Sequence, residues 1–516
     1  MFKKRRKPVL CLRRIKAGGR KLVCAALMLG MAGVVGGCSA GERLKEELQR
    51  RRQEKEWKEE SLEALTETQE EERESTERTD ASGIDISPKE SPGQTEGGGA
   101  LTGEGEAEGE TGETQGEAKA LVLPRRWDYR EMGKQPEAGD QGKFGTCWAF
   151  ASLMAIESSL LPEEQWSFSA DHMSRKNSFS MAQEDGGQYA MSMAYLLAWQ
   201  GPVLEADDPY GDGYSPDGLL PVKHVQEVRL LASKDYLAIK EAVYQTGGVQ
   251  SSLYTQLKDY TSRDKYYNEE TCGYYYDGEE KPNHNVVIIG WDDDYPKENF
   301  KQQPKKDGAF ICLNSWGPKF GEQGCFYVSY EDTNIGDTNV LYTKITDPRP
   351  EERIYQSDLC GWIGQIGYGE ESAYFSAVYQ AKEAEELTAV GFYATLPDTR
   401  YTVYAAKASS PKYMALTRPA AKGSFKEAGF YTVELSAPVQ LKAGETFTIV
   451  VDIETPGAVH PVAIEYQAPD LTGKVDLSDG EGYLSSDGKK WVSAEENQSC
   501  NLCLKAYTQV IEKTGQ

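Results

Sequence analysis

The chain has few histidines and a single Cys-x-x-Cys motif. Both shortages limit the kinds of catalytic and metal site that it can contain. Among 516 residues there are only four histidines: His172, His224, His284 and His460. Few positions can therefore supply a general base that works near neutral pH. The Cys500–Cys503 pair has the spacing of a redox or metal motif, but no second Cys-x-x-Cys accompanies it. This favours a structural role for the pair, and we expect neither a metal nor a cofactor.

Positive charge is scarce once the first residues are set aside. The chain carries 57 Lys and Arg against 82 Asp and Glu, a net charge of −25. Ten of the basic residues precede Cys38, so removal of that segment leaves about −35. Because such a chain repels phosphate, nucleic acid is excluded as an expected partner.

The beginning of the chain has the composition of an export signal. Residues 1–38 are basic and then apolar, and the uncharged run 22–37 has 16 residues, fewer than the roughly 20 that a spanning helix needs. Residues 35–38 (VGGC) resemble a bacterial lipobox. That resemblance implies an acylated Cys38 and a lipoprotein on the outer face of a bacterial cell membrane; an uncleaved signal-anchor helix is the alternative.

Residues 39–120 are acidic and of low complexity, as in the run GEGEAEGE at 103–110. A segment with so little apolar surface cannot offset the entropy lost on folding. We expect a disordered acidic linker that like charge keeps extended. An acidic propeptide that blocks a cleft is the other interpretation.

A glycine-rich turn at 141–146 leads to Cys147 and to an apolar run, 148–161, with helical spacing. A thiol at the start of a helix meets unpaired N–H groups and the positive end of the helix dipole. Both favour the nucleophilic thiolate. A buried structural cysteine is the plain alternative, and the residues that follow in the chain decide between them.

Two polar residues lie at the ends of apolar strand-like segments further along. His284 precedes the run VVIIGW at 286–291, and Asn314 follows FICL at 310–313. The order Cys, His, amide is that of a nucleophile, a general base and the group that orients the base. His172 and His224 lack such context; we expect a structural role for His172 and an exposed position for His224.

Residues 123–330 resemble the papain-like (C1 family) cysteine peptidases. The resemblance rests on five motifs in the family's order: LP…WDYR from 123, QGKFGTCWAF from 141, DGG at 185–187, NH at 283–284 and NSWG…FGEQG from 314. The family's cysteine three residues before the nucleophile is replaced by Phe144, so its usual disulfide is missing. An ion pair between Asp128 and Arg130 is expected to be structural.

The resemblance implies an endopeptidase of the α+β class, with a helical left lobe and a β-barrel right lobe. It assigns catalysis to Cys147, His284 and Asn314, with Gln141 in the oxyanion hole. It places Gly186, Gly187, Asn283 and Trp316 along the substrate cleft. The substrate is then a protein or peptide, cleaved through a thioester on Cys147. A thiol transpeptidase would use the same residues.

Beyond residue 345 the pattern changes to short alternating segments, such as 373–379, 387–393 and 446–452, separated by Gly, Pro and Asn. Regular short strands of this kind predict a β-sandwich. The region resembles the lectin-like domain of some prokaryotic papain-like peptidases, a likeness of fold that leaves open a glycan site or a brace.

The expected domains are 1–38, 39–120, 121–345 and 346–516. A non-catalytic surface adhesion or glycan-binding lipoprotein is the alternative function. Cys312 and Cys325 flank Asn314 and are candidates for a disulfide bridge.

Overall fold

The computed structural model describes residues 85–88 and 121–511. The predicted export signal, the lipidation of Cys38 and almost all of the predicted linker lie outside the described residues. Within the described part, no helix has both the length and the apolar character to cross a membrane.

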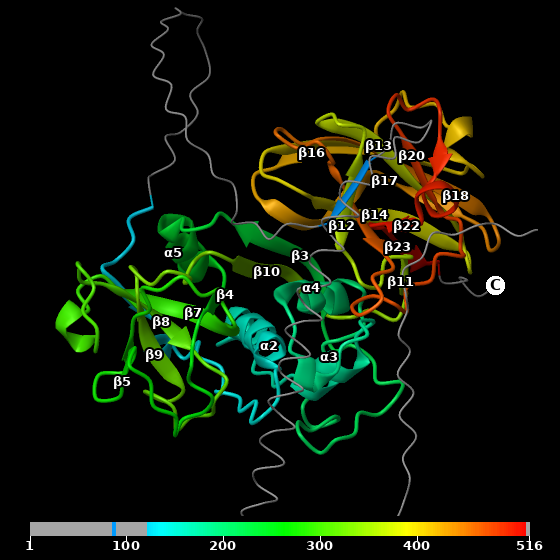
Figure 1. Cartoon of the computed structure of the whole chain (residues 1–516). Helices are drawn as coiled ribbons and strands as arrows, with labels where there is room; N and C mark the ends of the chain where they lie inside the picture. Colours follow the sequence, from blue (N-terminus) through cyan, green and yellow to red (C-terminus); the bar gives the residue numbers. More distant parts are fainter. Residues whose placement is uncertain (1–84, 89–120, 512–516) are drawn as a thin grey trace, which may run out of the picture. The chain divides into compact units, whose positions relative to one another are not determined.

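Helices dominate the first part of the papain-like region (Figure 1). They are α2 (Cys147–Leu160), α3 (Ala170–Lys176) and α4 (Tyr189–Leu197), with short 3-10 turns at Tyr129–Met132 and Gln183–Asp185. Helix α2 is buried on all sides, as expected of a helix that is apolar all round. It ends before Pro162, which cannot continue the helical hydrogen bonds. The predicted helix is therefore confirmed, one residue earlier than expected.

Strands form the second lobe. Most belong to one sheet, whose order in this lobe is β3-β10-β4-β7-β8-β9-β6-β5, with β2 (Arg126–Asp128) paired to β7. Beyond β3 the same sheet continues into the last third of the chain. Its first members by sequence are β3 (His224–Leu231), β4 (Val249–Leu253), β5 (Tyr267–Asn268), β6 (Gly273–Tyr274), β7 (His284–Asp292), β8 (Ala309–Leu313), β9 (Cys325–Ser329) and β10 (Asn339–Thr346). Helix α5 (Tyr236–Gln245) contacts β7 and β4.

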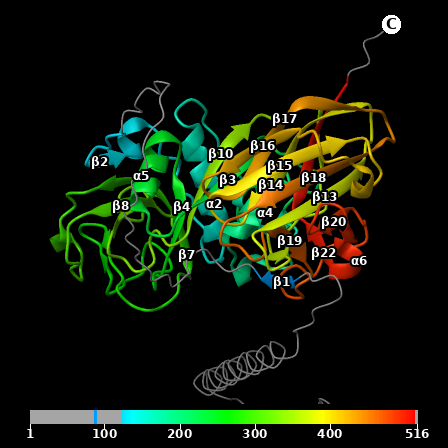
Figure 2. The same ribbon diagram turned by 90° about the horizontal axis from the view of Figure 1, so that it is seen from above.

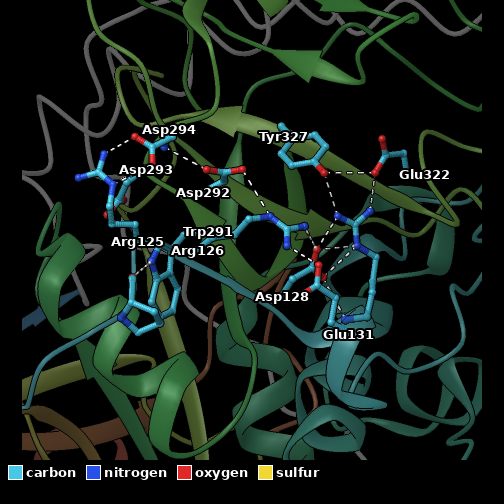
Figure 3. A network of polar contacts seen from close by, with 12 residues as sticks. Arg125, Arg126, Asp128, Glu131, Trp291, Asp292, Asp293, Asp294, Glu322 and Tyr327 are labelled. Atoms are coloured by element: carbon cyan, nitrogen blue, oxygen red, sulfur yellow. Dashed lines mark hydrogen bonds and ion pairs between the residues drawn. The ribbon is translucent and has the colours of Figure 1, made fainter.

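An ion-pair network holds the start of this region against the strand lobe (Figure 3). The Asp128 carboxylate is buried and lies 2.7 Å from guanidinium nitrogens of both Arg126 and Arg130. Arg126 also reaches Asp292 at the end of β7, and Arg130 lies 2.6 Å from Glu322. Burying a carboxylate requires such pairing. The predicted Asp128–Arg130 pair is confirmed and has a structural role.

The last third is a β-sandwich, as predicted. One layer has the order β16-β15-β18-β13-β20-β21, and β11, β23, β14 and β17 of the long sheet form the other. The core between them contains Phe375, Phe392 and Phe447. The remaining elements are β11 (Glu352–Tyr355), β12 (Gly364–Gly367), β13 (Ser372–Gln380), β14 (Glu385–Ala394), β15 (Thr399–Ala406), β16 (Ala421–Phe425), β17 (Ala428–Leu441), β18 (Thr446–Glu454), β19 (Val462–Tyr466), β20 (Gly482–Ser485), β21 (Val492–Ser493), α6 (Ala494–Gln498), β22 (Cys500–Leu502) and β23 (Leu504–Val510).

The sandwich and the papain-like region share a sheet, which the sequence did not predict. Strand β17 pairs with β3 from Ala428 opposite Leu230 to Tyr431 opposite Glu227 (Figure 2). His224 lies at this junction and is buried, so its predicted exposure is wrong. Its ring stacks on Trp199 with centroids 3.6 Å apart, and its Nδ1 lies 3.2 Å from Glu352 on β11.

A second difference concerns the predicted linker. Its residues Asp85–Pro88 form β1, which pairs antiparallel with β12. Strand β12 would otherwise be the edge of the sheet β12-β19-β22. Because an edge strand presents unpaired backbone groups, it can accept a further strand of almost any composition. The expectation of disorder is therefore wrong for these four residues.

Candidate active site

Cys147 is the first residue of α2, and its side chain is buried but not sealed, with 7% of the residue exposed. The preceding Thr146 is the N-cap residue, yet its side chain makes no capping hydrogen bond. The cap residue therefore provides no side-chain acceptor for the first N–H groups of the helix, which lie at the end that carries the thiol. This is an arrangement that stabilises an anion.

His284 and Asn314 are brought together by the pairing of β7 with β8. The His284 Nε2 lies 2.7 Å from Asn314 Oδ1. The same oxygen accepts a 2.8 Å hydrogen bond from the backbone N–H of Ser315, which fixes the amide with its oxygen toward the ring. Nε2 must then carry the hydrogen and donate it. The other ring nitrogen is left for Cys147.

The electrostatics of the pair favour its charged form. Burial alone raises the pKa of Cys147, but the charge and hydrogen bond of His284, with further hydrogen bonds from Asn285, bring the pKa below its ordinary value. Burial alone lowers the pKa of His284, but the charge of Cys147 and hydrogen bonds to Cys147 and Asn314 bring it above its ordinary value. A thiolate beside an imidazolium is the arrangement expected of a nucleophilic cysteine.

Trp316 covers this polar group. Its indole stacks on the His284 ring with centroids 4.7 Å apart and planes 26° apart, and only 4% of the residue is exposed. Excluding water strengthens the His284–Asn314 hydrogen bond, because the local dielectric falls. Trp316, which was predicted to line the substrate cleft, therefore lies directly against His284.

Gln141 is held by both ends of its amide. Its Oε1 accepts a 2.6 Å hydrogen bond from the Ser315 hydroxyl, and its Nε2 donates a 2.8 Å hydrogen bond to the carbonyl of Phe144. The fixed oxygen determines which way the NH2 group faces. One of its two hydrogens is used by Phe144, and the second remains for another acceptor.

The other predicted cleft residues have structural contacts that explain part of their identity. A Cβ on Gly187 would lie 2.3 Å from the Trp148 indole nitrogen, and Gly186 has a φ of +85° that favours glycine. The exposed Asn283 pairs through its amide with the N–H and carbonyl of Thr255, at 2.9 and 3.0 Å. Its side chain is therefore occupied by the loop after β4.

The remaining candidate residues stay apart from this site. His172 is buried, its Nδ1 lies 2.6 Å from the Tyr195 hydroxyl, and burial lowers its pKa to about 4, in agreement with a structural role. The suggested Cys312–Cys325 bridge is absent, since every cysteine among the described residues is a free thiol. Cys312 opposes Phe326 and Leu313 opposes Cys325, so the two thiols point to opposite faces of the sheet.

No group of metal-ligating side chains occurs within residues 121–511. Three residues that contact the site were not predicted: Ser315, Tyr210 and Asn285. The Asn285 Nδ2 lies 4.0 Å from the Cys147 sulfur. Its position directly after His284 was a usable signal, whereas Tyr210 lies 64 residues from Thr146, which it contacts, and no pattern marked it.

Comparison with known families divides the chain in two. Residues 123–343 match the model described as papain family cysteine protease, and residues 354–508 match the model described as lectin like domain. Cysteine proteinase 1 of Entamoeba histolytica is 26% identical over 245 residues, 45% of this chain and 73% of that protein. Mouse cathepsin K is 25% identical over 229 residues, 42% of this chain and 64% of that protein.

Among solved structures, the cysteine protease and lectin-like domains of Cwp84, a surface layer associated protein of Clostridium difficile, superpose with a TM-score of 0.66. They are 24% identical and cover 76% of this chain and 90% of that chain. At this identity the likeness shows the fold. The chain spans between 58% and 73% of the length of the curated relatives it matches.

Proposed function

Because this chain contains a papain-family cysteine protease domain followed by a lectin-like domain, we propose that it is a cysteine endopeptidase that acts at the cell surface. The observation that carries the proposal is the contact of the buried Cys147 thiol with His284, which Asn314 orients at 2.7 Å. The substrate is a protein or peptide. No metal or cofactor has a part in the chemistry.

In the proposed reaction His284 holds the proton of Cys147 and leaves a thiolate. The sulfur attacks the carbonyl carbon of the scissile peptide bond, and the carbonyl oxygen becomes an oxyanion. The backbone N–H of Cys147 and the free amide hydrogen of Gln141 would donate to that oxygen. Collapse of this intermediate breaks the C–N bond as the imidazolium gives its proton to the leaving amine.

The acyl group then remains on Cys147 as a thioester. Neutral His284 takes a proton from water, the hydroxide adds to the thioester carbonyl, and the thiolate leaves. The products are a carboxylic acid, which loses its proton to the solvent, and the original ion pair. An amine in place of water would give a transpeptidase, and the same residues support both outcomes.

The location of the protein and its further partners are inferred from features outside the active site. The basic and apolar start of the chain and the lipobox-like residues before Cys38 support a lipoprotein anchored on the outer face of a bacterial cell membrane. The likeness to a surface layer associated protein supports a place at the cell surface. The lectin-like fold supports a cell-surface glycan as a second partner, which would also suit a non-catalytic adhesion protein.

The test uses the full chain. An active-site-directed thiol reagent, followed by mass spectrometry of the tryptic peptides, is expected to label Cys147 stoichiometrically, and a diverse peptide library is expected to be cleaved. The absence of both labelling and cleavage would favour the adhesion protein. Amine-capped products in the presence of added amines would favour the transpeptidase.

A further inference from the structure

The turn that carries the nucleophile is held by one tyrosine from a distant loop. The Tyr210 hydroxyl donates a 2.9 Å hydrogen bond to the backbone carbonyl of Gln141 and lies 2.6 Å from the hydroxyl of Thr146. Since the phenol has a single hydrogen, which goes to Gln141, Thr146 must be the donor in the second bond. The result is a chain of two hydrogen bonds from Thr146 through Tyr210 to Gln141, which we call the relay.

Of the two residues joined by this relay, one carries an expected oxyanion donor and the other directly precedes the second. Gln141 carries the side-chain amide, and Thr146 is bonded directly to Cys147, whose backbone N–H is the second donor. The relay also accounts for the missing helix cap. Thr146 gives its hydroxyl to Tyr210, and its side chain makes no hydrogen bond to the first turn of α2.

Nothing covalent fixes the turn between these residues. Every cysteine in the described residues is a free thiol. Gly142 has a φ of +56°, and glycine can leave this conformation for others at little cost. Two backbone hydrogen bonds tie the turn to other segments: the Gln141 N–H donates to the Ser315 carbonyl at 2.9 Å, and the Gly145 N–H donates to the Gln183 carbonyl at 3.0 Å.

Tyr210 is itself well fixed. Its ring meets Phe150 and Phe144 edge-on, at centroid distances of 4.8 and 6.4 Å, and its backbone N–H donates to the Glu205 carboxylate at 2.8 Å. Burial raises the pKa of Tyr210 to about 12. The hydroxyl therefore stays protonated and able to donate at any pH at which a thiol peptidase works.

We propose that Tyr210 is a positioning residue for peptide hydrolysis, which sets the spacing between the Gln141 amide and the Cys147 N–H so that both reach one oxyanion. The proposal rests on the peptidase function proposed above. Within the described residues the hydrogen bonds and ring contacts of Tyr210 go to Gln141, Thr146, Glu205, Phe144 and Phe150. It therefore acts on the developing negative charge and leaves formation of the thiolate unchanged.

The test is a Tyr210→Phe variant of the full chain, which keeps the ring contacts and removes the hydroxyl. We expect kcat on a peptide substrate to fall about tenfold, the worth of one hydrogen bond, with KM within about twofold. Alkylation of Cys147 by iodoacetamide needs a thiolate but no oxyanion site, so its rate and pH profile should stay as in the wild type. Tyr214→Phe, an exposed tyrosine of the same loop, is the matched control and should change nothing.

A double-mutant cycle separates positioning from general stability. In a Gln141→Ala background, where one of the two donors is gone, Tyr210→Phe should lower kcat by no more than about threefold. A second full tenfold loss, or a parallel loss in the alkylation rate, would overturn the proposal. If Tyr210→Phe does not fold, Thr146→Val breaks the same relay, and an unchanged kcat in that variant would also overturn it.

Failure of this inference differs from failure of the proposed function. A wild-type chain that cleaves no peptide removes the peptidase function altogether. An active wild type with a fully active Tyr210→Phe variant removes only the role of Tyr210.

Discussion

The papain-like and lectin-like regions each bury a cysteine, but the pKa values of the two thiols shift in opposite directions. In the first, the pKa of the buried Cys147 lies below its ordinary value, since His284 outweighs the effect of burial. In the second, burial raises the pKa of Cys500 far above its ordinary value. Lys505 and Asp358, also in the second region, lie 2.8 Å apart with almost no exposure, and they neutralise each other.

The difference shows that burial does not activate a thiol by itself. Burial disfavours charge on every cysteine that the structure describes, and only a fixed base close to the sulfur reverses the effect. Cys147 has that base and a helix N-terminus, whereas Cys500 has only the carbonyl of Ala494 at 4.0 Å. The location of the charged partner therefore separates a reactive cysteine from a core residue.

The largest expected effect on activity comes from removing one of these two buried thiols, which tests the contrast between them directly. Cys147→Ala should abolish peptide hydrolysis, because no other described cysteine has an imidazole beside it. Cys500→Ala removes a buried sulfur from the second region and should leave kcat within about twofold, at a loss of about 1 kcal/mol in unfolding free energy. Steady-state kinetics and urea unfolding of both variants provide the measurement. Residual turnover in Cys147→Ala would point to another nucleophile.

A smaller effect is expected from Gln141→Ala. Loss of one oxyanion donor should lower kcat by roughly 10²–10³ while Cys147 remains available to iodoacetamide. Gln135→Ala, whose amide reaches only the Gln323 carbonyl at 3.0 Å, is the control and should be fully active. Equal kcat in the two variants would exclude Gln141 from the oxyanion site.

The smallest effect on activity is expected at the buried Lys505–Asp358 pair, where a substitution should have the largest effect on stability. Lys505→Met leaves the Asp358 carboxylate buried without its partner and should lower the unfolding free energy by about 3–5 kcal/mol. Turnover below the unfolding transition should not change. Lys407→Met breaks the exposed pair with Glu445 and should cost less than about 1 kcal/mol. A loss of turnover in Lys505→Met without unfolding would show that the two regions are coupled.

The residues near the thiol were predictable because their neighbours in sequence mark them. Cys147 follows a glycine turn and precedes an apolar helix, and His284 and Asn314 stand at the ends of apolar strands that β-pairing brings together. The burial of His224 was not predictable, since it depends on Trp199 and Glu352, each from a different segment. Alternation reveals strands but not their partners, and so the β17–β3 pairing across the two regions was not foreseen.

The pH dependence of Cys147 alkylation by iodoacetamide, in the wild type and in His284→Ala, tests the central claim most directly. The wild type is predicted to have a Cys147 pKa below that of an ordinary thiol, so that its alkylation midpoint is shifted to acid. In His284→Ala the stabilising charge is lost, and the midpoint should move up to or beyond the value of about 8.5 for a free cysteine. Identical midpoints in the two proteins would contradict the thiolate–imidazolium pair and the mechanism built on it.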